Sequence, residues 1–173
     1  MRLPFHVFNL ASIILPARWS SVRARLLRWC GASVGAGVSL SSAVRVYGEF
    51  VEIGDQTWVS PETVFLTGPG GHVTLGPRCD VGPGVCFATG SHVIGGSKRR
   101  AGQGTQRPIV VGAGSWIGAR SVLLGGSVIG AGSIVAAGSV VMAGNYPPDV
   151  LLAGVPARVK KELNGQGDAD RRE

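Results

Sequence analysis

The 173-residue chain is poor in aromatic and charged residues, which make up 6% and 16% of it. It contains 28 glycines among many aliphatic residues, a composition that argues against an ordinary helical bundle. No Gly-X-Y period is present, which excludes a collagen-like triple helix. The length suffices for one domain with a hydrophobic core.

Cysteine is also scarce. Cys30, Cys79 and Cys86 are an odd, unclustered set, which gives neither a disulfide framework nor the spacing of metal ligands. The sequence therefore favours a reducing compartment and predicts no metal cofactor.

No long hydrophobic run occurs in the chain. The N-terminal stretch MRLPFHVFNLASIILPARW has a short apolar segment that His6 and Asn9 interrupt, which is atypical of a cleaved secretory signal. No segment reaches the roughly 20 apolar residues of a membrane-spanning helix. We therefore predict a cytoplasmic location.

Acidic residues are outnumbered by basic residues, 10 to 17, and the resulting net charge of +7 suggests an anionic partner. The basic residues form no long run with interleaved aromatic residues, and no zinc-finger or RNP-type motif is present. Nucleic acid is therefore not the predicted partner.

What the chain does have is a six-residue repeat. From residue 111 an aliphatic residue recurs every sixth position, and a serine stands four positions after each of the first five. The aliphatic residues are Val111, Ile117, Leu123, Ile129, Val135 and Val141, and the serines are Ser115, Ser121, Ser127, Ser133 and Ser139. Period six fits no α-helix, and glycine at this density costs a helix about 1 kcal/mol per residue.

The same period occurs earlier, with one slip and one short insertion. These nine positions are Val34, Leu40, Val46, Ile53, Val59, Phe65, Leu75, Val81 and Phe87. Three hexads make one coil of three short strands, and stacked coils bury the aliphatic residues in a continuous core. The repeat therefore predicts an all-β fold, a parallel β-helix of about five triangular coils.

Both ends of such a prism need caps, because an open end exposes unpaired strand edges. Residues 20–31 place Val22, Leu26 and Trp29 at helical spacing, which predicts an amphipathic helix over the first coil. We divide the chain into an N-terminal helical cap over 1–33, the β-helix over 34–146, a C-terminal cap over 147–163 and a disordered tail over 164–173.

The six-residue repeat is interrupted within residues 88–112 and then resumes. This segment contains His92 and a polar, glycine-rich run with Lys98, Arg99 and Arg100. The interruption predicts a loop, about residues 93–108, that leaves the prism and forms a binding wall. The three basic residues suit anionic groups of a substrate, and a merely solvated loop is the alternative.

The run IVVGAGSWIGARSVLLGGSVIGAGSIVAAGSVV, followed by PPDVLLAGVPARVKK, resembles the hexapeptide-repeat acyltransferases. FATGSH before the loop and PIVVG after it resemble the sugar O-acetyltransferases, and the layout of residues 20–162 is similar to colanic-acid-type exopolysaccharide acetyltransferases. The resemblance implies a left-handed β-helix, acetyl-coenzyme A as co-substrate, and a homotrimer with active sites between subunits.

In that family the histidine matching His92 is the catalytic base, so the resemblance implies acetyl transfer to a hydroxyl of a sugar or glycan intermediate. Imidazole suits proton removal near neutral pH. The thiolate leaves readily, and donors such as backbone N–H groups stabilise the oxyanion. Direct transfer needs no acyl-enzyme.

The resemblance also implies a coenzyme A site. Two small residues stack where the pantetheine arm lies, and two basic residues approach the nucleotide phosphates. Met142 and Ala143 depart from the family pattern, which often has Thr-Lys there. The matching positions are Trp116, Ala119, Ala137, Met142, Ala143, Arg158 and Lys161.

Two other functions stay open. A β-helix can be a non-catalytic scaffold, since fold does not imply function. A zinc-dependent carbonic anhydrase-like enzyme needs three histidines, but only His72 and His92 lie within reach of one another. The Arg- and Trp-containing N-terminal helix adds a hypothesis of peripheral contact with the inner face of a membrane, with a simple end cap as the alternative.

Overall fold

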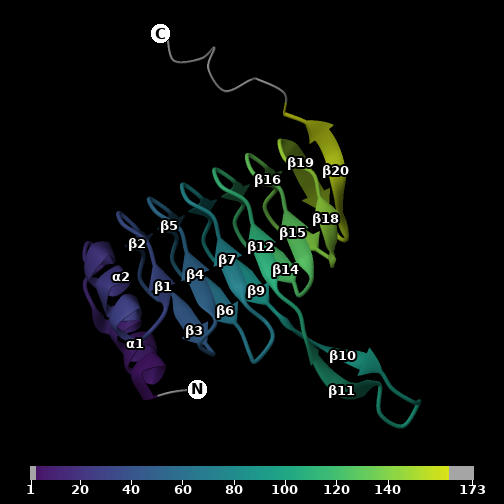
Figure 1. Ribbon diagram of the computed structural model, residues 1–173, viewed down its shortest axis with the longest axis horizontal. Helices are drawn as coiled ribbons and strands as arrows, with labels where there is room; N and C mark the ends of the chain where they lie inside the picture. Colours follow the sequence, from purple (N-terminus) through teal and green to yellow (C-terminus); the bar gives the residue numbers. More distant parts are fainter. Residues whose placement is uncertain (1–2, 164–173) are drawn as a thin grey trace.

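The computed structural model describes residues 3–163, which form a triangular prism of short parallel strands with two helices at its N-terminal end (Figure 1). It is a left-handed parallel β-helix, as predicted. Five complete coils are followed by the first two strands of a sixth, so the predicted count of about five is confirmed and slightly exceeded. The predicted disordered tail lies outside the described residues.

The strands make three faces, which we call A, B and C. Face A consists of β1 (Ser33–Val34), β4 (Val51–Ile53), β7 (Val73–Leu75), β12 (Ile109–Val111), β15 (Ser127–Ile129) and β18 (Gly144–Tyr146). Face B consists of β2 (Ser39–Leu40), β5 (Trp58–Val59), β8 (Asp80–Val81), β13 (Trp116–Ile117), β16 (Ile134–Val135), β19 (Val150–Gly154) and β20 (Ala157–Glu162). Face C consists of β3 (Arg45–Tyr47), β6 (Val64–Leu66), β9 (Cys86–Ala88), β14 (Val122–Leu124) and β17 (Val140–Val141).

The repeated aliphatic residues line the core of the prism. All fifteen predicted positions are buried, and Phe65 stacks on Phe87 in the next coil with ring centroids 4.9 Å apart. Burying an aliphatic side chain contributes about 1.5–3 kcal/mol, so the stacked column supplies the main stabilisation of the fold. The predicted hexad pattern is confirmed.

The repeated serines are buried at the corners of the prism, and all except Ser127 form hydrogen bonds to the next coil. The Ser121 hydroxyl lies 3.0 Å from the Ala136 carbonyl oxygen, and the Ser115 hydroxyl lies 3.2 Å from that of Gly130. Only a small side chain fits at such a corner. A Cβ atom on Gly118 would lie 2.5 Å from the Ala137 nitrogen, so glycine there permits the close stacking of two coils.

Two helices cap the first coil, α1 (Leu3–Ile14) and α2 (Ser20–Trp29). The helical spacing of residues 20–31 predicted α2 but not α1, and of the three residues predicted to face the coil Leu26 packs against the core whereas Trp29 does not. Arg23 and Leu27 are fully buried, whereas Trp29 is 73% exposed. Arg23 turns inward because its guanidinium donates to carbonyl oxygens at the C-terminal end of α1, including those of Ser12 and Pro16 at 3.1 Å.

At the other end, β19 continues face B as a parallel strand and β20 folds back antiparallel beside it. No helix among the described residues is long and apolar enough to cross a membrane.

Candidate active site

The predicted loop is a β-hairpin arm that projects from the corner between faces C and A (Figure 1). Its strands are β10 (Gly90–Ile94) and β11 (Ala101–Gln106), which pair antiparallel. The predicted segment does leave the prism, and it consists largely of two paired strands. His92 lies within β10, opposite Gly104.

His92 lines a hollow of about 300 Å3 where the base of the arm meets the C–A corner. Met142 and Ala143, predicted to belong to the coenzyme A site, line the same hollow. The full lining consists of Thr89, Gly90, Ser91, His92, Val93, Thr105, Arg107, Leu124, Gly125, Met142 and Ala143.

The imidazole of His92 is exposed, and within residues 3–163 it makes no hydrogen bond. It is thus free to accept a proton from a bound hydroxyl. The backbone N–H groups of Gly125 and Arg107 are already used, donating to Ala88 at 2.8 Å and Thr89 at 3.0 Å. The Arg107 guanidinium gives this hollow a permanent positive charge, a feature that the sequence analysis did not assign.

The other predicted coenzyme A residues lie at a different corner. Ala119 and Ala137 occupy successive coils at the B–C corner, where the Gly138 N–H donates to the Ala119 carbonyl oxygen at 2.8 Å. Trp116 is exposed on face B, in strand β13, which leads directly into that corner. Within one chain, face C separates these three residues from His92.

Arg158 and Lys161 lie on β20, at the C-terminal edge of face B. Lys161 is opposite Leu151, which lies in the same row of paired residues as Trp116 and Ile134. Both basic side chains are exposed. They therefore share a face with Trp116 and not with His92.

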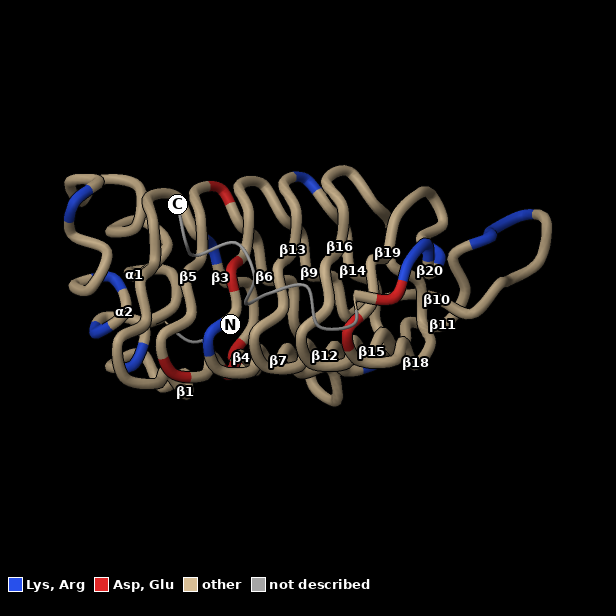
Figure 2. The backbone as a smooth tube through the Cα atoms, turned by 90° about the horizontal axis from the view of Figure 1, so that it is seen from above, with Lys and Arg blue, Asp and Glu red and all other residues tan. Residues whose placement is uncertain are grey.

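Lys98, Arg99 and Arg100 form the tip of the arm, away from the prism (Figure 2). None of them lines the His92 hollow. In one chain the basic tip and the histidine thus belong to different parts of the arm.

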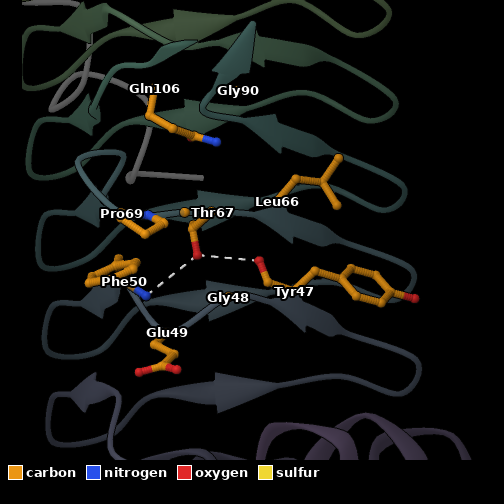
Figure 3. A pocket seen from close by; sticks show the side chains of 10 residues that line it. Tyr47, Gly48, Glu49, Phe50, Leu66, Thr67, Pro69, Gly90 and Gln106 are labelled. Atoms are coloured by element: carbon orange, nitrogen blue, oxygen red, sulfur yellow. Dashed lines mark hydrogen bonds between the residues drawn. The ribbon is translucent and has the colours of Figure 1, made fainter. Parts of the chain in front are cut away.

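A second hollow of about 500 Å3 lies on the other side of the arm base (Figure 3). Tyr47, Glu49 and Phe50 line it from one coil, and Gly90 and Gln106 line it from the arm. Gly90 borders both hollows, so they flank the same stretch of β10. No sequence signal marked this hollow, because its residues come from three separate segments.

Gln106 joins the arm to the prism. The hydroxyl of buried Thr89 donates to Oε1 of Gln106 at 2.6 Å and lies 3.0 Å from the Leu66 carbonyl oxygen. This contact fixes the base of the arm beside both hollows.

Face C is apolar on its outer side. Only Arg45 among its outward residues is charged, and Tyr47, Leu66 and Met142 are each about 40% exposed. The Cys86 thiol lies half-buried in this face, and burial raises its pKa. In the described part of the chain, no group of three or more His, Cys, Asp or Glu side chains gathers to hold a metal ion.

Comparison with known proteins gives the family. The model of the bacterial transferase hexapeptide (six repeats) matches residues 108–143. A crystal structure of a hexapeptide-repeat acetyltransferase from Vibrio cholerae, in complex with acetyl-coenzyme A, has a TM-score of 0.82 and 32% identity and covers 94% of this chain and 86% of its own. The chain belongs to the hexapeptide-repeat acyltransferases.

Two sugar-related members of this hexapeptide-repeat family are also similar. The galactoside O-acetyltransferase of Escherichia coli (strain K12) is 32% identical over 133 residues, which are 66% of this chain and 65% of the relative. A galactoside acetyltransferase solved with coenzyme A has a TM-score of 0.80 and 26% identity, and the match covers 94% of this chain and 80% of that one. The predicted family is confirmed, whereas the colanic-acid type stays a prediction.

Proposed function

We propose that this protein is an acetyl-coenzyme A-dependent O-acetyltransferase whose acceptor is a hydroxyl of a sugar or glycan intermediate. The observation that carries the proposal is the unpaired imidazole of His92, which lines one hollow two residues from Gly90, where a second hollow begins. The relatives solved with acetyl-coenzyme A or coenzyme A support the donor, and the galactoside O-acetyltransferase supports a sugar acceptor.

In the proposed mechanism His92 accepts the proton of the acceptor hydroxyl as its oxygen attacks the thioester carbonyl carbon. The carbon–sulfur bond then breaks, and the imidazolium returns the proton to the coenzyme A thiolate. The products are an acetyl ester and a free thiol. The guanidinium of Arg107, in the same hollow, favours the oxyanion that forms between these two steps.

The hollow beside Glu49 is the proposed acceptor site. Carboxylate and backbone groups there can hydrogen-bond sugar hydroxyls, and Phe50 offers a ring against which a sugar packs (Figure 3). Its border at Gly90 lies two residues from His92, so an acceptor hydroxyl reaches the imidazole from this side.

The proposed donor site lies between subunits. Trp116, Ala119 and Ala137 flank one edge of face C, and His92 stands at the other edge. If three copies turn their apolar C faces toward a common threefold axis, the B–C corner of one copy meets the C–A corner of the next. A homotrimer therefore unites the two halves of the site and covers the exposed side chains of face C.

In this trimer the arm reaches toward a neighbouring copy, and its tip carries Lys98, Arg99 and Arg100. We expect their joint replacement by Ala to raise the acceptor KM about three- to tenfold for a charged acceptor, since each lost contact contributes a fraction of a kcal/mol. Steady-state kinetics with charged and neutral acceptors measures this. An unchanged KM for the charged acceptor contradicts the binding role.

Calorimetric titration with acetyl-coenzyme A, followed by a thiol-release assay with galactosides and other saccharides, tests the proposed function. We expect micromolar-range binding at one site per subunit, and thiol release that depends on an acceptor hydroxyl. An acceptor with that hydroxyl removed is the control. A protein that binds no acetyl-coenzyme A cannot be the proposed transferase, and the scaffold alternative then leads.

A peripheral position at a membrane is also part of the proposal, because glycan intermediates are often carried on lipids. The exposed Trp29 and the exposed arginines Arg25 and Arg28 of the helical cap support it.

A further inference from the structure

Helix α1 is apolar on two opposite sides. Phe5, Phe8 and Ser12 point inward and are fully buried. On the opposite side, an outer stripe of four aliphatic residues runs the length of the helix at spacings of three and four. Its members are Leu3, Val7, Leu10 and Ile14, which are 77%, 48%, 61% and 69% exposed.

The outer stripe has no packing role in the fold. At 3.6 residues per turn its four side chains fall within about 60° of the helix circumference, facing away from the first coil. A surface helix of a globular protein normally presents polar residues on that side. A stripe of this kind therefore indicates a further apolar partner.

The charge around the stripe indicates what that partner is. Residues 1–48 contain six arginines and no Asp or Glu, so this segment carries six of the seven net positive charges of the chain. The described arginines of this segment lie on the helical cap and the first coil, at one end of the prism (Figure 2). Arg18, Arg25 and Arg28 are exposed there. An apolar face on a cap that carries arginines and no carboxylate is complementary to a surface with an apolar interior and anionic groups above it.

The aromatic residues of the cap fit the same surface. Trp19, which follows α1, is 42% exposed, and Trp29 at the end of α2 is 73% exposed. Tryptophan prefers the boundary between hydrocarbon and water. The 12 residues of α1 measure about 18 Å, less than the hydrocarbon thickness of about 30 Å, so this helix would lie in the plane of the membrane.

We propose that α1 is an interfacial anchor, whose outer stripe inserts among the acyl chains of a membrane containing anionic lipid while the cap arginines contact the headgroup phosphates. The proposal rests on the membrane contact proposed above and assigns it to α1 rather than to α2. An end-to-end dimer through the same stripe is the competing arrangement, but it would bring two arginine-rich, carboxylate-free caps together, and like charges oppose that contact.

Flotation of the full-length protein with lipid vesicles tests this inference without coenzyme A or acceptor. The vesicles are phosphatidylcholine alone, or phosphatidylcholine with about one third phosphatidylglycerol. The test variant is Leu10→Asp/Ile14→Asp. A matched control, Val128→Asp/Val159→Asp, makes the same charge change at two exposed valines of β15 and β20. Circular dichroism and size-exclusion chromatography verify that both variants are folded.

We expect the natural protein and the control variant to float with the anionic vesicles about tenfold more strongly than the test variant, and only weakly with neutral ones. Equal flotation of the test and control variants overturns the inference. If Trp29→Ser alone abolishes flotation, α2 carries the contact, and the assignment to α1 fails while the proposed membrane contact stands. If no protein floats, both the assignment to α1 and the proposed membrane contact fail. In that case, loss of self-association by the test variant in size-exclusion chromatography would show that the stripe contacts a second copy of the chain.

Discussion

Replacing His92 with Ala is expected to lower kcat about 10²- to 10⁴-fold and to leave the affinity for acetyl-coenzyme A nearly unchanged. A positioned general base contributes a factor of this size, and the imidazole makes no hydrogen bond in the described structure that its loss would break. The side chain is exposed, so the substitution leaves no cavity. Steady-state thiol release and calorimetry measure the two quantities separately.

The matched control for this experiment is His6→Ala, which removes another exposed imidazole from the outer surface of the cap. With an acceptor free in solution, kcat of this control should equal that of the natural protein. A fall in donor affinity without a fall in kcat for His92→Ala would make this residue a binding group rather than the base.

Replacing Ala137 with Trp is expected to raise the KM for acetyl-coenzyme A about tenfold or more and to leave the fold intact. Ala137 is exposed at the B–C corner, directly above Ala119 in the coil before it, so a large side chain there fills the proposed pantetheine slot. Because Ala137 is exposed, folding should be little affected.

Ala131→Trp is the control for this substitution. Ala131 is also exposed and holds the equivalent hexad position at the corner between faces A and B, where no donor site is proposed. Equal values of the KM for acetyl-coenzyme A in the two variants would contradict the placement of the donor site at the B–C corner.

The core of this fold could be predicted from sequence because the six-residue period fixes every inward residue. Val111 and the five aliphatic residues that follow it at that spacing are all buried, and so are the serines between them. Each hexad has the same local structure, a short flat strand followed by a tight corner. A deviation in one hexad therefore does not change the prediction for the others.

The irregular parts of the chain could not be predicted in this way. Arg23 is buried because its guanidinium satisfies carbonyl oxygens of α1, a partner that helical periodicity does not reveal. The position of His92 depends on the pairing of β10 with β11, whose glycine-rich sequence has no strand alternation. Glu49 and Gln106 meet only through the stacking of coils, so no spacing in the sequence joins them.

The proposed active site is divided between two corners of the prism, so that donor binding and proton removal are carried out by different parts of a chain. Ala119 and Ala137 would hold the donor at one edge of face C, and His92 would remove the proton at the other. A single chain holding both parts could not use them together. Catalysis would therefore depend on assembly.

Subunit complementation tests this division most directly. His92→Ala and Ala137→Trp, each nearly inactive alone at low acetyl-coenzyme A, are co-expressed with different affinity tags, and the mixed oligomers are purified. If each site takes His92 from one subunit and Ala137 from its neighbour, every mixed trimer has about one fully natural site in three, and activity returns to about a third of the natural level. Mixed oligomers as inactive as the two parents would place both residues in one chain's site and contradict the account.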